Sequence, residues 1–240
     1  VILNGFPINY DKQLFDNDTV SFIKKGEKLS KEEIQEVMIS RHTPGVYEVL
    51  KEAKVGIAGL GGLGSNIALS LARIGVGNLT LVDFDVVEPS NLNRQAYYIE
   101  QLGCLKTEAT LENIKRINPF INVDIINTFI DKKNAKDIFK DCEIVIEAFD
   151  NPICKAELIN SILLNTDKII ISGNGMAGVY PSNTIKTKKL NKRLYICGDG
   201  VSEAKEFCGL MSTRVLIASG HMANTTCRVL LKNIEVDGDL

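Results

Sequence analysis

The sequence predicts an α/β protein with a Rossmann-like nucleotide-binding fold and a mainly parallel sheet. Two observations lead to this fold class. Residues 54–94 contain, in order, a strand, a glycine-rich turn, a helix, a second strand and an acidic residue. Apolar segments short enough for strands then alternate with helical segments as far as residue 172. Such alternation is typical of a parallel sheet covered by helices on both faces.

The first 28 residues predict a small β appendage that is too short to fold alone. Its strand-like pieces, 1–3 and 19–23, are separated by turn-forming residues such as Asn4 and Gly5. Residues 30–39 predict a helix, because Ser30 and Glu33 form a capping box. We therefore divide the chain into an appendage (1–28), a helical linker (29–53) and a nucleotide-binding domain (54–240).

The glycine-rich turn follows the first core strand, which the apolar run 55–58 predicts. Glycines let backbone N–H groups approach a phosphate at the positive end of a helix. The next strand, 79–82, ends on Asp83, whose carboxylate is placed to accept two ribose hydroxyls. Ser65 is expected to open the helix, and it joins the expected nucleotide ligands of this turn, which are Gly59, Gly61, Gly62 and Gly64.

The alternation continues after a polar, turn-rich segment at 84–95. The expected helices are 106–117, 132–140 and 154–165, and the expected strands are 122–129, 143–149 and 168–172. The pattern changes at Gly173, beyond which 180–187 and 193–198 predict antiparallel strands joined by a basic turn, 186–193. A final helix is expected over about 211–232.

Composition excludes several classes of protein. The 240 residues carry a net charge of −2, which argues against a nucleic-acid-binding surface. We find no apolar run long enough to cross a bilayer. The six cysteines form no C-x-x-C pair, so zinc is not expected, and their mostly apolar surroundings favour a cytoplasmic protein with reduced thiols.

Polar side chains beyond the strand ends indicate which nucleotide is bound. A glycine turn alone is equally typical of a dehydrogenase, and an NAD-dependent oxidoreductase is one alternative. A triphosphate carries about twice the charge of a dinucleotide pyrophosphate, so it requires fixed cations and a metal held by a carboxylate. The residues in position for these roles are Asp85, Asn91, Arg94, Gln95, Lys106 and Asp150.

The segments GLGGLGS (59–65), LVDFDVVEPSNLNRQ (81–95), LGCLKTEA around Lys106 and AFDN around Asp150 resemble the ThiF/MoeB family, relatives of the ubiquitin-activating enzymes. The resemblance covers roughly 54–175, and Gly209 to Met211 with the last helix is similar to a shorter ThiF-like subgroup. It implies ATP-dependent adenylation of the C-terminal glycine of a β-grasp carrier protein. It also implies roles for single residues: Asp83 on the ribose, Asn91, Arg94 and Lys106 on the phosphates, and Asp150 on Mg²⁺.

Each of these residues also has a structural interpretation. Arg94 could form a salt bridge between its loop and the core. Lys106 could be a solvated lysine at the start of a helix, and Asp85 could stabilise a turn. Asp150 is able to cap the helix that follows it. His42 and His221 have no partners at a metal-binding spacing and are interpreted as structural.

Residues 1–28 are similar to the second half of a ThiS-type carrier, but Gly26 and Glu27 run on into the enzyme instead of ending in Gly-Gly. The appendage is therefore interpreted as a non-reacting fused piece. The expected partner is a separate ThiS-like carrier, and the expected pathway is thiamine thiazole formation. A MoeB-like enzyme, a tRNA-modifying dehydratase and a non-catalytic nucleotide-binding scaffold remain alternatives. Cys197, followed by Cys208, is the candidate for any thiol step, although a buried strand cysteine is the more favoured interpretation of Cys197.

Arg41 precedes the first core strand and matches by position the family's arginine that reaches into the ATP site of the other protomer. The resemblance therefore implies a homodimer in which Arg41 completes the partner's site. The alternative is a surface arginine that is favoured by the dipole at the end of helix 30–39.

Overall fold

The computed structural model describes residues 1–23, 26 and 29–233. Its main body is a seven-stranded sheet in the order β6-β5-β4-β7-β8-β10-β9. All neighbouring strands are parallel except β9, which runs antiparallel to β10. The strands are β4 (Lys54–Ala58), β5 (Asn78–Asp83), β6 (Asn122–Asn127), β7 (Ile144–Glu147), β8 (Ile169–Gly173), β9 (Lys186–Asn191) and β10 (Leu194–Gly198). The predicted fold class is confirmed.

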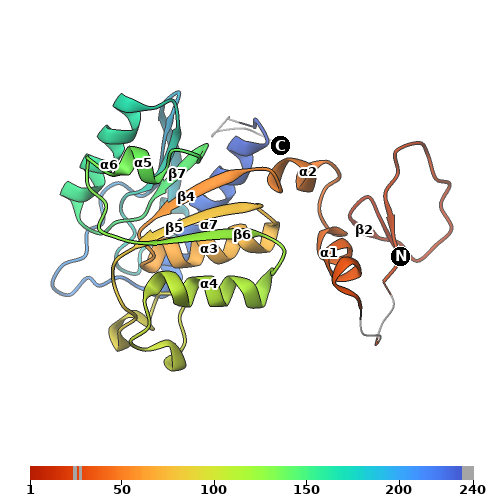
Figure 1. Ribbon diagram of the computed structural model, residues 1–240, viewed down its shortest axis with the longest axis horizontal. Helices are drawn as coiled ribbons and strands as arrows, with labels where there is room; N and C mark the ends of the chain where they lie inside the picture. Colours follow the sequence, from red (N-terminus) through yellow and green to blue (C-terminus); the bar gives the residue numbers. More distant parts are fainter. Residues whose placement is uncertain (24–25, 27–28, 234–240) are drawn as a thin grey trace.

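Helices cover both faces of this sheet, as the alternation predicted (Figure 1). On one face α3 packs against α4 and α7, and on the other α5 packs against α6. The helices are α1 (Lys31–Ile39), α2 (Val46–Leu50), α3 (Gly62–Ile74), α4 (Lys106–Ile117), α5 (Ala135–Ile138), α6 (Pro152–Asn165) and α7 (Ser212–Leu230), with 3₁₀ turns η1 (Pro89–Asn91), η2 (Ile99–Gln101) and η3 (Ser182–Thr184).

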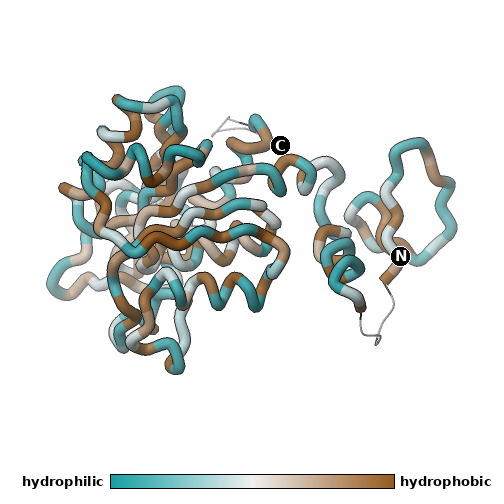
Figure 2. The backbone as a smooth tube through the Cα atoms, viewed as in Figure 1, coloured by the Kyte–Doolittle hydropathy of each residue, from teal (hydrophilic) through white to brown (hydrophobic). Residues whose placement is uncertain are grey.

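The hydrophobic core is divided by the sheet into two layers. Ile57 and Leu81 belong to the layer under α3 and α7, whereas their neighbours Ala58 and Val82 belong to the layer under α5 and α6. This division follows from the alternation of side chains along a strand, and it explains why the central strands are almost wholly apolar. Figure 2 shows apolar stretches of the chain running through the strands of the sheet.

The strand order reverses between β4 and β7, and this reversal fixes the place of the candidate site. The chain moves outward from β4 to β5 and β6, then returns to place β7 on the other side of β4. Loops leaving the carboxyl ends of β4 and β7 therefore diverge and leave a crevice, the usual ligand position in open α/β sheets.

The appendage forms a separate antiparallel sheet of order β2-β1-β3, from β1 (Ile2–Leu3), β2 (Phe6–Pro7) and β3 (Val20–Ser21). Asn4 and Gly5 form the tight turn between β1 and β2, with φ of +50° and +82°. In Figure 1, α1 lies between this small sheet and the main body. The predicted appendage boundary at residue 28 and the end of the domain at 240 lie outside the described residues.

Four predicted elements need correction. Helix α3 begins at Gly62, not at Ser65, so the last two glycines of the motif lie in its first turn. The predicted strand 180–187 does not form as such, because η3 interrupts it and only its last two residues belong to β9. The basic segment predicted as a turn is mostly strand β9, and the reversal is confined to the residues between β9 and β10. Helix α5 is shorter than the predicted 132–140.

Candidate nucleotide-binding site

The turn between β4 and α3 is shaped by glycines that have no room for a side chain. Gly59 has φ of +88°, and a Cβ at Gly64 would stand 1.8 Å from the carbonyl oxygen of Gly59. A Cβ at Gly61, in contrast, would meet nothing within 4 Å. Gly61 is the N-cap of α3 and has no side chain to cap the helix. The first amide groups of α3 therefore have no side-chain cap, which is compatible with the anion contacts that the sequence predicts there.

Asp83 is fixed against this turn at the end of β5. Its Oδ2 accepts a hydrogen bond from the backbone N–H of Leu60 at 2.6 Å, and its Oδ1 accepts one from the N–H of Asp85 at 2.8 Å. The side chain is buried. Each carboxylate oxygen keeps a second lone pair, so this geometry is compatible with the predicted contacts to ribose hydroxyls.

Arg94 lies across the start of α3. A Cβ at Gly62 would be 3.5 Å from Cγ of Arg94, so the stem of the arginine covers the turn. Nη1 of Arg94 donates to the carbonyl of Ser90 and to Oδ1 of Asn93. Its Nε is buried and has no hydrogen-bond partner among the described residues. Because an unpaired buried N–H is unfavourable, this donor suits an incoming phosphate oxygen.

The loop that carries Arg94 is tied to α3 by polar side chains of the helix. Ser65 donates from Oγ to the carbonyl of Gly61 at 2.7 Å and accepts from the N–H of Ala96 at 3.0 Å. Asn66 donates to two carbonyls, one of them that of Arg94. The hydroxyl of Ser65, predicted to bind nucleotide, is therefore committed to the backbone and fixes the turn. Asn66 was not predicted.

Two further predicted ligands, Asn91 and Gln95, are buried in the same loop. Oδ1 of Asn91 accepts from the N–H of Glu88 and so closes the turn η1. Oε1 of Gln95 is buried without a hydrogen-bond partner in the part of the chain that the structure describes. Asn91 thus shapes the loop, while Gln95 retains an acceptor for a ligand hydroxyl or a water.

Lys106, the first residue of α4, is buried and paired with Asp85. Its Nζ lies 2.9 Å from Oδ2 of Asp85, and its backbone N–H donates to the carbonyl of Asp85. The two side chains are 8% and 49% exposed. Lys106 is therefore not the solvated lysine of the structural alternative, and Asp85 does more than form a turn. Asp85 thus holds the ammonium group of Lys106 in place at the mouth of the site.

Asp150 follows β7 and is exposed beside the glycine turn. The backbone N–H of Ala148 donates to the carbonyl of Ala58 at 2.9 Å, which joins the ends of β7 and β4. The N-cap of α6 is Asn151, whose Oδ1 accepts from two N–H groups, so the alternative that Asp150 caps this helix is wrong. Its carboxylate is free of that role.

A magnesium ion fits this donor set. No cluster of three or more potential ligands occurs within residues 1–23, 26 and 29–233. Mg²⁺ usually takes only one or two carboxylates and completes its shell with phosphate and water oxygens. Asp150 offers one such carboxylate at the sheet edge, and its contact with Mg²⁺ stays a prediction.

Glu147, the last residue of β7, was not predicted and is fully buried. Its carboxylate pairs with Lys155 of α6 and accepts from Oγ of Ser172 at 2.6 Å and from the N–H of Phe149 at 2.7 Å. It therefore locks β7, β8 and α6 together beneath Asp150. The signal in the sequence was a single glutamate within an otherwise apolar strand.

Tyr97, also not predicted, supports the glycine turn from below. Its hydroxyl donates to the carbonyl of Leu60 at 2.8 Å and contacts Oγ1 of Thr110. Burial raises the pKa of the Tyr97 hydroxyl above its usual value, so the group stays protonated and remains a donor.

Arg41 does not join the site of its own chain. It is exposed and follows α1. Figure 1 shows α1 and α2 at the amino end of β4, whereas the glycine turn leaves the carboxyl end. A role for Arg41 at a nucleotide requires a second protomer, which is how its role was predicted.

The two candidate cysteines differ in access. Cys197 is fully buried in β10, and burial raises the pKa of its thiol despite contacts to Thr187 and Thr225. Cys208 is partly exposed in the loop before α7. The structural interpretation of Cys197 is therefore favoured, because nucleophilic cysteines are accessible and hold their thiolate more readily.

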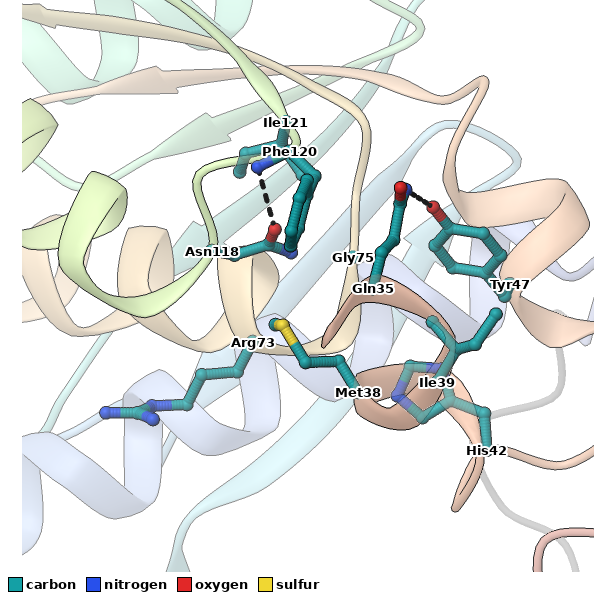
Figure 3. Close-up of a pocket in the computed structure, with 10 residues that line it drawn as sticks. All are labelled: Gln35, Met38, Ile39, His42, Tyr47, Arg73, Gly75, Asn118, Phe120 and Ile121. Atoms are coloured by element: carbon teal, nitrogen blue, oxygen red, sulfur yellow. Dashed lines mark hydrogen bonds between the residues drawn. The ribbon is translucent and has the colours of Figure 1, made fainter. Parts of the chain in front are cut away.

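A small cavity of about 10 Å³ lies elsewhere, between α1 and the nucleotide-binding domain (Figure 3). Nε2 of Gln35 donates to the hydroxyl of Tyr47 across this junction. His42 also lines it, and burial lowers the pKa of His42, which favours a neutral ring. The cavity belongs to the linker, and it is large enough only for about one water.

Comparison with known proteins agrees with this geometry. The ThiF family profile matches residues 35–238, and the profile described as ThiS-like ubiquitin matches residues 1–26. The tRNA threonylcarbamoyladenosine dehydratase of Haemophilus influenzae is 37% identical over 155 residues, which are 64% of this chain and 59% of the relative. The adenylyltransferase and sulfurtransferase UBA4 of Candida glabrata is 36% identical over 156 residues, 62% of this chain and 36% of the relative. The matched region thus spans less than two thirds of either relative.

Among solved structures, the Escherichia coli tRNA N6-threonylcarbamoyladenosine dehydratase TcdA in complex with ATP has a similar fold. The TM-score is 0.76 at 20% identity, over 88% of this chain and 100% of that one. Across the described residues, the helices are too short or too polar to span a membrane. The glycine turn, the two cations and the carboxylate all lie where the strand order reverses. Because the ThiF profile also matches most of its length, the chain belongs to the ThiF family.

Proposed function

We propose that this protein uses ATP to adenylate the C-terminal glycine carboxylate of a ThiS-type sulfur-carrier protein, for thiamine thiazole formation. The observation that carries the proposal is the pairing of an uncapped helix terminus with two cations, the partly buried Arg94 and the buried Lys106. A dinucleotide pyrophosphate does not need both cations, whereas a triphosphate does. This argument sets the NAD-dependent alternative aside.

In the proposed reaction a carrier carboxylate oxygen attacks the α-phosphorus of ATP. A bond forms between that oxygen and phosphorus, the bond to the β-phosphate oxygen breaks, and pyrophosphate leaves. Such a reaction requires positioning and charge neutralisation more than covalent help from the protein. Asp83 would hold the ribose, Nε of Arg94 would donate to a phosphate oxygen, and Lys106 would exchange Asp85 for phosphate. Mg²⁺ on Asp150 would supply further charge compensation at the departing pyrophosphate.

The ThiS-like segment at residues 1–26 supports a carrier of the same class as the partner, because fused pieces commonly reflect a functional association. We also propose a cytoplasmic homodimer in which Arg41 reaches the partner's site. The net charge of −2 argues against a nucleic-acid substrate, and the absence of a C-x-x-C pair from the sequence argues against a zinc site. We also propose no membrane attachment for this chain.

A second candidate function is ATP-dependent dehydration of a tRNA nucleoside. The name of the Haemophilus influenzae relative favours it, because that protein is 37% identical to this chain over 155 residues. Both candidates would use the same nucleotide site, so the acceptor alone distinguishes them. The acidic balance of the chain argues against tRNA, since RNA-binding surfaces usually carry a basic excess.

The test is ATP–pyrophosphate exchange measured with a purified ThiS-type carrier and, separately, with total tRNA. Exchange that depends on the carrier, together with a carrier increased in mass by one AMP, supports the proposal. Exchange stimulated only by tRNA supports the second candidate. NAD(H) binding without exchange contradicts both.

A further inference from the structure

Two loops beyond the nucleotide site form one continuous surface. They are residues 174–181, after β8, and residues 199–211, after β10. The N–H of Gly178 donates to the carbonyl of Gly209 at 2.8 Å, and the N–H of Ala177 donates to Oγ of Ser202 at 3.0 Å. The two loops therefore hold each other in place at the carboxyl edge of the sheet.

A buried ion pair joins this surface to the glycine turn. Nη2 of Arg214, in the first turn of α7, lies 2.5 Å from Oδ2 of Asp199, and both side chains are almost fully buried. Nη1 of Arg214 donates to the carbonyls of Tyr180 and Pro181. Cγ1 of the next residue, Val215, would be 3.1 Å from a Cβ at Gly62, so α7 packs closely against the glycine turn. The loops are thus fixed relative to the phosphate-binding turn.

The surface of the two loops is apolar. Phe207 is fully exposed, Val201 is 87% exposed and Val179 is 79% exposed, and Tyr180 is half-exposed. Apart from the buried Asp199, the loop 199–211 carries two acidic residues, Glu203 and Glu206, and a single lysine. Exposed apolar patches mark interaction sites, and one without a basic excess suits a protein better than an RNA backbone.

Phe207 is held at the tip of its loop by a strained backbone. Lys205 and Cys208 exchange two backbone hydrogen bonds, of 3.0 and 2.8 Å, so Glu206 and Phe207 form a two-residue turn. Phe207 has φ of +62° in the position of the turn where glycine or asparagine is usual. A bulky residue in this conformation is an outlier, and such strain concentrates at functional sites. Its ring contributes nothing to the core, because it is fully exposed.

We propose that Val179, Tyr180, Val201 and Phe207 dock the carrier protein through an apolar patch on that partner, with Phe207 as the anchor. The inference rests on the proposed function, and it assigns the acceptor class as protein, not RNA. Docking here would direct the carrier's C-terminal tail toward Asp150, because β8 lies directly beside β7 in the sheet and β10 lies next to β8.

The test is Phe207→Gly in the full chain, with Leu164→Ala on α6 as the matched control. Leu164 is 81% exposed and belongs to a helix on the other face of the sheet. Glycine relieves the positive φ and removes no buried contact, so the thermal midpoint of Phe207→Gly should not fall below that of the wild type. The KM for a purified ThiS-type carrier in pyrophosphate exchange should rise about fivefold or more, with the KM for ATP unchanged. Leu164→Ala should change neither constant.

The outcomes separate the two proposals. Carrier-dependent exchange by the wild type and an unchanged carrier KM in Phe207→Gly would overturn the docking surface alone. A wild type that exchanges only with tRNA, or not at all, would overturn the proposed function and the docking with it. An equal rise of both KM values would show that Phe207 acts on the nucleotide site, which also contradicts docking.

Discussion

Asp150 is the residue on which the proposed chemistry depends most directly. It offers an exposed carboxylate next to the glycine turn, and Asn151 relieves it of any role in capping α6. We expect Asp150→Ala to lower the rate of pyrophosphate exchange at least a hundredfold in Mg²⁺, because the triphosphate charge loses its metal ligand. Thermal unfolding should change little, since the side chain is exposed.

The matched control is Asp141→Ala, which removes an exposed carboxylate at the other end of β7. It should exchange pyrophosphate at the wild-type rate. Equal rates for Asp150→Ala and the wild type at saturating Mg²⁺ would show that another residue holds the metal.

Cys197 tests whether a thiol of the enzyme takes part in sulfur transfer. Its burial and raised pKa predict that Cys197→Ala still supports formation of the carrier thiocarboxylate, as measured by mass spectrometry of the carrier. The free energy of unfolding should fall by about 1 kcal/mol, because a small side chain leaves the core. Loss of the thiocarboxylate with adenylation intact would place the thiol in the mechanism.

At the level of elements, the junction between α7 and the loop after β10 depends on the Asp199–Arg214 pair. Burial alone would raise the pKa of Asp199, but hydrogen bonds from Ser202, Val201 and Arg214 outweigh it and hold that pKa well below its usual range. In the unfolded chain the pKa returns to about 3.9. The contribution to stability is therefore full above about pH 4 and is lost as the pH falls below that value.

We expect Asp199→Asn to lower the free energy of unfolding by about 3 kcal/mol at pH 7, because it leaves a buried guanidinium without its counter-charge. The difference between the variant and the wild type should narrow when urea unfolding is repeated between pH 4 and pH 2.5. A difference that stays constant down to pH 2.5 would assign the effect to packing instead of charge.

The sequence predicted the elements of the nucleotide site well because its signals are local. The glycine motif, Asp83 at a strand end and the capping box of α1 each depend on residues within a few positions. The prediction of a strand over 180–187 failed because the contacts that shape this segment are distant in sequence. Arg214, more than 30 positions away, takes the carbonyls of Tyr180 and Pro181 and holds them out of a strand.

For the site residues too, local motifs predicted the residue, whereas the contacts made through the fold could not be predicted. Lys106 and Arg94 were named from their motif, yet nothing in the sequence indicated that Asp85 would pair with Lys106 or that Ser65 would be used by backbone groups. Glu147 was missed because strand periodicity describes apolar burial and does not identify a buried carboxylate with three partners. Partners brought together by the fold are not visible to a local pattern.

At the level of the whole molecule, the proposed role of Arg41 in the partner's site would make activity a property of two chains. We expect Arg41→Ala and Lys106→Ala to be inactive alone. Mixing them should restore about a quarter of the wild-type exchange, because half of the randomly exchanged dimers hold one intact site in two. Recovery would be measured after subunit exchange has been verified by mass spectrometry of mixed dimers.

Mixed dimers that form without recovered exchange would contradict the role of Arg41 in its partner. A wild type that sediments as a monomer while fully active would contradict the homodimer itself. Either result would leave the nucleotide site of the single chain as described.

The position of β9 at the end of the sheet has a consequence for behaviour in a crowded solution. An outermost strand presents backbone groups that another molecule's strand can pair with, which is a route to aggregation. Three of the six residues of β9 are lysines, Lys186, Lys188 and Lys189. A strand arriving from another copy of the protein would have to align its own lysines against them. The same positive charge that favoured a turn in the sequence-based prediction thus disfavours pairing of two β9 strands, because like charges on neighbouring sheets repel each other.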